Sequence, residues 1–339
     1  MTRRLEVTRA QIVAFRRRSG SLDERLPPGR RSLRAAAWAG LQDSTPRAAL
    51  LSMHARVDGI APGSWEDPSL VQVWGPRLSV YVVAERDRAV FTTSRLPDDF
   101  AARRDVEQMA DRLEAFLKGR RMPYVEAGRG LGEKPNALRY AAPTGRVLMR
   151  WDGAQRPTIW MVPAPVGPGD ARLELTRRYL HVFGPTTAAA FARWAAIRPQ
   201  RCRAAFDSLA GSLTPVRSPV GDAWILAQDE DALHNSAGRD VATARLLPSG
   251  DSYFLLQGAD RQLLVPDPAR QRELWTPRVW PGAVLVDGEV AGTWRRAGPV
   301  VRIHSWRRLS RMAREAVELE AQSFPLPDVQ GRIRVQWDT

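Results

Sequence analysis

A repeated order of short helices followed by strands most constrains the fold of this chain. The segment 30–41 predicts one helix, 47–56 a second and 65–73 a short third, and the β-branched run 78–83 predicts a strand. Helix, helix, short helix and strand is the order typical of a winged helix, in which a β-hairpin wing follows a helix-turn-helix. The first quarter of the chain therefore predicts a winged-helix motif.

The same order returns in the second quarter of the chain. An amphipathic helix is expected at 106–117 and a short one at 137–142, followed by strands at 145–151 and 157–162. The Asp152-Gly153 pair between these strands favours a hairpin turn. A hairpin directly after a short helix is again a wing, so the sequence predicts tandem winged-helix motifs.

The last third of the chain is richer in strands. A hairpin is expected at 281–295 with a further strand at 300–304, and a basic helix at 307–322 follows them. The expected fold class is therefore α+β, with tandem winged-helix motifs packed against a C-terminal β-rich region. We expect a first winged-helix region at 1–98, a second with connecting helices at 99–228, and the C-terminal region at 229–339. Because no low-complexity linker separates these regions, they are expected to form one continuous body.

The charge of the chain points to a polyanionic partner. The formal net charge is +14 and the isoelectric point about 11.1. Nearly all of the positive charge is arginine, since Lys118 and Lys134 are the only lysines. Arginine presents a planar fork that matches phosphate oxygens, and a strongly basic domain is typical of nucleic-acid binding. A GC-rich genome, which enriches arginine without any function, is the alternative explanation.

Other residue types exclude several classes of site. Cys202 is the only cysteine, which rules out a disulfide framework and a multi-cysteine metal site within one chain. The four histidines are far apart, without metal-ligand spacing. No apolar run approaches the roughly 20 residues of a membrane span, and the first residues lack a signal-peptide core. We expect a monomer without metal or other cofactor, located in the cytoplasm near the nucleoid.

A polar triplet at a predicted helix boundary is the best candidate site. The apolar segment from Trp38 ends in Gln42, Asp43 and Ser44, and Pro46 precedes the helix expected at 47–56. Amide, carboxyl and hydroxyl groups held at such a junction can position a water on a substrate. The alternative is that they only cap the following helix.

Four sequence pieces, in this order, resemble the AlkZ/YcaQ-type winged-helix DNA glycosylases. They are Gly40–Leu50 (GLQDSTPRAAL), Trp65–Arg77 (WEDPSLVQVWGPR), Tyr179–Pro185 (YLHVFGP) and Pro281–Trp294 (PGAVLVDGEVAGTW). The resemblance covers most of the chain. It implies tandem winged-helix motifs arranged as a C-shaped, positively charged channel for double-stranded DNA. It also implies excision of N7-alkylated purines and, in some members, the unhooking of interstrand crosslinks.

The resemblance assigns catalysis to the polar triplet. The family signature is Gln, a small or aliphatic residue, then Gln or Asp. Gln42 matches the first position, Asp43 occupies the middle, and Ser44 stands where the second Gln or Asp would be. We expect Gln42, Asp43 and Ser44 to be the catalytic residues. A non-catalytic winged-helix DNA-binding protein, acting as a regulator or damage binder, is the alternative.

Arginines on the predicted hairpins and on the basic helix are the candidate contacts to DNA phosphates. A solvated face is the alternative for each group. The residues are Arg77, Arg146, Arg150, Arg156, Arg307, Arg308 and Arg311.

Overall fold

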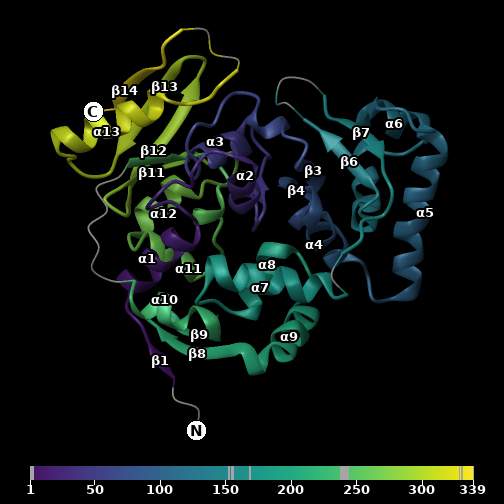
Figure 1. Cartoon of the computed structure of the whole chain (residues 1–339), viewed down its shortest axis with the longest axis horizontal. Helices are drawn as coiled ribbons and strands as arrows, with labels where there is room; N and C mark the ends of the chain where they lie inside the picture. The colour runs from purple at the N-terminus through teal and green to yellow at the C-terminus, as the bar shows by residue number, and fades with distance from the viewer. Residues whose placement is uncertain are drawn as a thin grey trace.

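The computed structural model describes residues 4–151, 153, 156–167, 169–236, 244–327, 329 and 331–338. In this part of the chain, helices and three β-sheets pack into an α+β fold (Figure 1). The described residues between 100 and 161 lie at one side of the molecule, and the C-terminal sheet lies at the opposite side. Within the described ranges, no helix combines the length and the apolar character that a membrane span requires.

The first of three similar structural units carries the polar triplet. Its elements are α2 (Arg30–Ala36), β2 (Leu41–Gln42), α3 (Ala48–His54), the 3-10 turn η1 (Ser64–Glu66), β3 (Leu70–Trp74) and β4 (Val80–Ala84). Both β2 and β3 pair antiparallel with β4, so the first strand of the unit lies beside its last. Gln42 is opposite Tyr81 in this pairing, and Gln72 is opposite Val82.

The second unit repeats this order and extends the same sheet. Its elements are α5 (Phe100–Leu117), β5 (Met122–Pro123), α6 (Tyr124–Gly130), the 3-10 helix η5 (Pro135–Thr144), β6 (Val147–Arg150) and β7 (Thr158–Met161). Both β5 and β6 pair with β7. A single register contact, Gln72 opposite Met149, joins β3 to β6. The strand order of this central sheet is therefore β2-β4-β3-β6-β7-β5. In each unit the second strand lies at the β3–β6 contact, the third strand beside it, and the first strand at the outer edge.

The third unit has the same order around a smaller sheet. Its elements are α7 (Ala171–Phe183), α8 (Ala188–Ala195), α9 (Pro199–Ser208), β8 (Leu213–Ser218) and β9 (Gly221–Leu226). An isolated bridge between Thr186 and Trp224 stands where the other units have a first strand. The N-terminal strand β1 (Leu5–Glu6) pairs parallel with β8. The aromatic rings of α7 and α8 pack against one another and fill the core here.

The C-terminal sheet is formed by strands distant in sequence. It contains β10 (Ala244–Leu247), β11 (Gly282–Val286), β12 (Glu289–Ala297), β13 (Val300–Ser305) and β14 (Arg334–Asp338). Helix α13 (Arg311–Gln322) packs Val317 and Ala321 onto the apolar side chains of this sheet. The other α-helices of the described chain are α1 (Arg9–Ser19), α4 (Arg88–Thr92), α10 (Glu230–His234), α11 (Asp260–Leu264) and α12 (Pro268–Leu274).

Most expected elements are confirmed, and three are corrected. The helix expected at 30–41 ends at Ala36, and Leu41 instead lies in strand β2, where it pairs with β4. The helix expected at 307–322 begins at Arg311. The expected helix at 65–73 is a 3-10 turn ending at Glu66, followed by strand β3. The segment Leu70–Trp74 pairs with a strand on each side, because its β-branched and aromatic residues suit a buried strand better than a helix. The central sheet draws its strands from both sides of the expected boundary at residue 98. The Asp152-Gly153 turn lies partly outside the described residues, since Asp152 is not among them.

Two glycines with the same backbone angle test how closely the central sheet is packed. Gly40 has φ +77°, and a Cβ there would lie 2.6 Å from the Phe91 ring, whereas Gly119 has φ +76° and open space around it. We expect Gly119→Ala to lower the free energy of unfolding by about 1–2 kcal/mol, for the left-handed backbone alone. Gly40→Ala should cost roughly 2–5 kcal/mol, because overpacking adds to that penalty. Urea denaturation measures both, and equal losses would contradict the packing described.

Candidate active site

The polar triplet lies at a sharp junction between a strand and a helix. Gly40 enters with a left-handed backbone, and β2 holds Leu41 and Gln42 against β4. The Asp43 amide continues this pairing by donating to the Val80 carbonyl at 2.8 Å. Arg47, also left-handed at φ 64°, turns the chain into α3. The triplet is thus fixed by backbone contacts on both sides.

The side-chain amide of Gln42 is held in one orientation. Its Oε1 accepts hydrogen bonds from Arg77 Nη2 at 3.0 Å and from Tyr81 Oη at 3.4 Å. Burial raises the pKa of Tyr81 to about 12, so this hydroxyl keeps its proton as a donor. The amide nitrogen faces Gly250, where a Cβ would lie 3.2 Å from Nε2. Gln42 therefore lies between the β3–β4 turn and the loop after β10.

Asp43 has different partners and is almost completely buried, with 4% of its surface exposed. Its Oδ1 accepts from the Ala49 amide at 2.9 Å, and its Oδ2 accepts from Gln72 Nε2 at 2.7 Å. Burial raises the pKa of Asp43 to about 6, although these hydrogen bonds and the charge of Arg47 oppose the shift. The carboxyl group is consequently ionised at neutral pH in a region of low dielectric.

Gln72 extends the contacts of Asp43 to the second unit. Its Oε1 accepts from the Trp151 amide at 2.6 Å, and its Nε2 donates to the Trp151 carbonyl at 3.0 Å. Sequence reasoning missed this residue, although a glutamine within the apolar strand Leu70-Val-Gln-Val-Trp74 is a detectable signal. Ser44, by contrast, is exposed, so its hydroxyl is open to solvent beside Gln42.

A buried ion pair places the loop that faces Gln42. Arg56 donates from both Nη atoms to Asp251, at 2.7 and 2.8 Å, and Ser52 Oγ donates to the same carboxylate at 2.6 Å. Arg56 and Asp251 are 2% and 1% exposed, so the pair is shielded from water. Since Gly250 directly precedes Asp251, the ion pair fixes the wall of the site. Sequence reasoning missed the pair of Arg56 and Asp251, because these two residues are 195 positions apart in the chain.

The structure engages most of the arginines expected at DNA in contacts within the protein. Arg77 caps Gln42, and Arg146 pairs with Asp111 and Glu114. Arg150 lies 3.8 Å from the centre of the Trp65 ring and pairs with Glu66, while Arg156 is exposed after the β6–β7 turn. Among the described residues, Arg146 and Arg150 thus have acidic partners of their own and share none.

The basic residues near the C-terminus share one cavity. Arg307, Arg308, Arg311 and Arg314 line a hollow of about 580 Å³ beside Trp337. Arg307 and Arg308 precede α13, which begins at Arg311. Arg311 pairs with Glu315 at 2.8 Å, and Arg307 lies 3.8 Å from Asp287. Arg308 is exposed, so this group retains charge that faces solvent.

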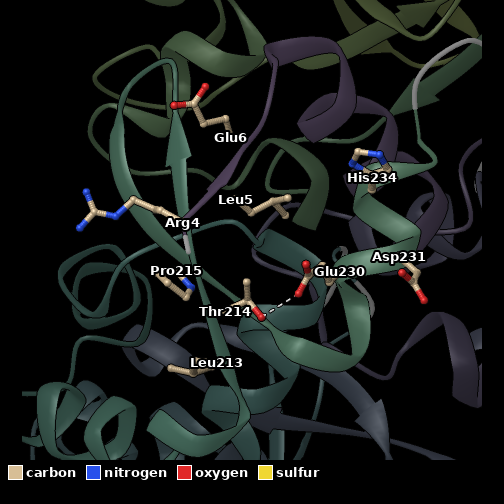
Figure 2. A pocket seen from close by; sticks show the side chains of 9 residues that line it. All are labelled: Arg4, Leu5, Glu6, Leu213, Thr214, Pro215, Glu230, Asp231 and His234. Atoms are coloured by element: carbon tan, nitrogen blue, oxygen red, sulfur yellow. Dashed lines mark hydrogen bonds between the residues drawn. The ribbon is translucent and has the colours of Figure 1, made fainter. Parts of the chain in front are cut away.

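A larger cavity of about 860 Å³ lies elsewhere, against β1, β8 and α10 (Figure 2). Glu6, Glu230, Asp231 and His234 contribute to its wall, and Glu230 accepts a hydrogen bond from Thr214 at 3.0 Å. Its acidic lining is unsuited to a polyanion, and no residue of the polar triplet lines it. Among the residues that the structure describes, no cluster of three or more His, Cys, Asp or Glu could hold a metal ion.

Comparison with known proteins gives a consistent result. A family model described as "DNA glycosylase AlkZ-like" matches residues 35–325. The "Interstrand DNA cross-link repair glycosylase" of Streptomyces sahachiroi is 24% identical over 273 residues, which cover 76% of this chain and 69% of that protein. The solved structure of Streptomyces sahachiroi DNA glycosylase AlkZ superposes with a TM-score of 0.77, covering 98% of this chain and 100% of that one. At 18% identity, this structural likeness shows a shared fold.

The burial of Asp43 predicts a specific pH dependence of stability. Its folded pKa of about 6 lies above the ordinary value of 3.8, so the folded state binds the proton more tightly. The free energy of unfolding of the wild type, relative to Asp43→Asn, should therefore rise as the pH falls from about 7 to 4, by on the order of 1–3 kcal/mol. Denaturant titrations of both proteins across this range measure the difference. A difference independent of pH would contradict a buried, ionised Asp43.

Proposed function

The chain belongs to the AlkZ-like DNA glycosylase family, hydrolases of N-glycosyl bonds, and from this premise we propose that it releases N7-alkylated purines from double-stranded DNA. The reaction uses a water oriented by Gln42 and the negative charge of Asp43. The single observation that carries the proposal is the position of the Gln42 amide, which the pairing of β2 with β4 fixes at the strand–helix junction beside the exposed Ser44.

The chemistry of the substrate sets what the site must supply. An N7-alkylated purine is cationic, so it leaves as a neutral base without strong acid catalysis. The sugar then develops the positive charge of an oxocarbenium-like transition state. The site must orient a water and offset that charge. A glutamine carbonyl suits the first task, because it can accept a hydrogen bond from the attacking water.

Asp43 suits the second task without touching the substrate. Its carboxylate is adjacent to Gln42 in the chain, buried, and hydrogen-bonded through both oxygens. A fixed negative charge in a low-dielectric region acts over a longer distance than one in water. We propose that it stabilises the positively charged sugar by its field. Ser44, exposed on the same segment, contributes a hydroxyl that can hold the water beside Gln42.

The repeated units support a proposed mode of DNA binding. Each has helices followed by two antiparallel strands, with the first strand or bridge paired to the last strand, which is the connectivity of a winged helix. We propose tandem winged-helix motifs that form a C-shaped, positively charged channel for the duplex. Arg150, Arg156, Arg308 and Arg311 would contact phosphates there, so binding would weaken with added salt. We propose that the protein acts as a monomer.

The proposed substrates include bulky adducts and interstrand crosslinks. The Streptomyces sahachiroi relative is named for cross-link repair. In addition, the water-handling groups lie on a strand–helix junction between a hairpin turn and a loop, which does not require the damaged base to be extruded into an enclosed pocket.

The assignment of Gln42 predicts a large loss of activity on truncation. Under single-turnover conditions with N7-methylguanine DNA and with a crosslinked duplex, we expect Gln42→Ala to slow base release by roughly 10²–10³-fold, the scale of losing one positioned transition-state contact. Ser44→Ala should cost less, about 3–10-fold, because it removes a weaker contact. Cleavage at the abasic product measures both rates.

Gln228→Ala is a matched control, since Gln228 is exposed on the 3-10 turn after β9. It should release base at the wild-type rate. Wild-type activity in Gln42→Ala would overturn the assignment of the site. Absence of base release by the wild type from both substrates would overturn the proposed function itself.

A further inference from the structure

We propose that Arg77 is a positioning residue that couples duplex binding to the Gln42 amide: in the free protein its guanidinium caps the Gln42 carbonyl, and a DNA backbone phosphate draws it away. This inference rests on the proposed role of Gln42. Arg77 Nη2 donates to Gln42 Oε1 at 3.0 Å, and Tyr81 Oη donates to the same oxygen. A carbonyl oxygen has two lone pairs, so both are occupied and none remains for a water.

The guanidinium of Arg77 is charged but has only a neutral partner. Across the described ranges, no carboxylate lies within 4 Å of it, whereas Arg56, Arg146, Arg150 and many others are paired with Asp or Glu. Arg77 is half-buried, so one side of the group remains accessible to solvent. An arginine fork binds a phosphate through two charge-assisted hydrogen bonds, which are stronger than one bond to an amide. A phosphate would therefore displace the Gln42 contact.

The backbone presents Arg77 at the tip of the β3–β4 turn. Arg77 and Leu78 both have left-handed conformations, at φ 57° and 54°, which is uncommon for two successive residues with side chains. Arg95 Nη1 anchors the base of this turn by donating to the Gly75 carbonyl at 2.7 Å. Pro76 precedes Arg77 and restricts the backbone further. These contacts hold the backbone of the turn, so the proposed release requires only the side chain of Arg77 to move.

A second arginine, Arg261, interacts electrostatically with Arg77. Arg261 lies over the rings of Trp275 and Trp280, at 4.9 and 5.5 Å, and donates Nε to the Leu256 carbonyl. Within the described chain it has no carboxylate partner either. Burial lowers the pKa of Arg261, and the charge of Arg77 adds to this effect. An anion bound at Arg77 would offset the repulsion, and the anion that the substrate brings next to its damaged nucleotide is a phosphodiester.

The proposal is tested by combining a neutral substitution at Arg77 with DNA in which single phosphates are uncharged. Arg77→Met keeps the length of the side chain and removes its charge. Each phosphate flanking the N7-methylguanine is replaced in turn by an uncharged methylphosphonate. For the wild type, a methylphosphonate at one of these positions should lower the single-turnover rate at saturating DNA at least tenfold. Without a charged phosphate there, Arg77 would remain on the Gln42 carbonyl. Arg77→Met should respond less than twofold at that position and should exceed the wild-type rate on that neutral DNA.

On ordinary DNA, Arg77→Met should bind about tenfold more weakly and reduce the salt slope of binding by about 0.9, the effect of one lost phosphate contact. Its rate at saturation should fall far less than that of Gln42→Ala, because in this variant no arginine caps the Gln42 carbonyl. Arg308→Met is the control variant. It should also reduce the salt slope of binding, but methylphosphonate at the sensitive position should slow it as much as it slows the wild type. If Arg77→Met slows the saturated reaction as Gln42→Ala does, or if no position separates it from the wild type, the proposal is wrong.

An activity-independent readout separates this inference from the proposed function. The ¹⁵N resonance of the Gln42 side-chain amide, assigned by its loss in Gln42→Ala, should shift when undamaged duplex is added to the wild type. In Arg77→Met the free protein should already show the shifted resonance, and DNA should change it little. An unchanged resonance in the wild type would overturn the coupling, whether or not any base is released.

Discussion

The hydrogen-bonded chain from Ala49 through Asp43 and Gln72 to Trp151 is the constraint on which the rest of the site depends. It connects the start of α3, the polar triplet, the centre of the sheet and the end of β6. Gln72 lies where the two halves of the central sheet meet, opposite Met149. One carboxylate therefore fixes both the strand–helix junction and the boundary between the first two units.

The same constraint explains why the Asp43 carboxylate acts differently from the amide beside it. Burial makes its charge costly and raises its pKa to about 6, while its two hydrogen bonds keep the ionised form at neutral pH. A group so enclosed cannot approach a sugar, but its field is weakly screened. Gln42 is less buried and has solvent-facing neighbours, so in the proposed mechanism the direct contact with water falls to the amide. The proposed mechanism thus divides positioning and charge between adjacent residues.

The sequence indicates many arginines, and the structure shows that they do several different things. Arg16, Arg17, Arg56 and Arg178 are buried and bond to carbonyls or carboxylates inside the fold. The net charge of +14 therefore does not imply a uniformly positive surface for a nucleic acid, since some of the arginines are buried. Composition cannot separate the two groups, because burial depends on which distant segments pack together. The exposed arginines near the C-terminus and at the β6–β7 turn are among those whose charge faces solvent.

The sequence by itself determined the repeated helices and hairpins, the family, and the location of the polar triplet. These depend on local periodicity, turn residues and short motifs, which are readable over a few residues. It did not determine that 70–74 is a strand, because an apolar run of that length fits either state until sheet partners lie on both sides. Nor did it reveal the contacts of Gln72, Arg77 and Asp251 around the triplet. Those contacts join segments up to 199 residues apart, so only the tertiary structure decides which polar groups share a buried site and which remain free for substrate.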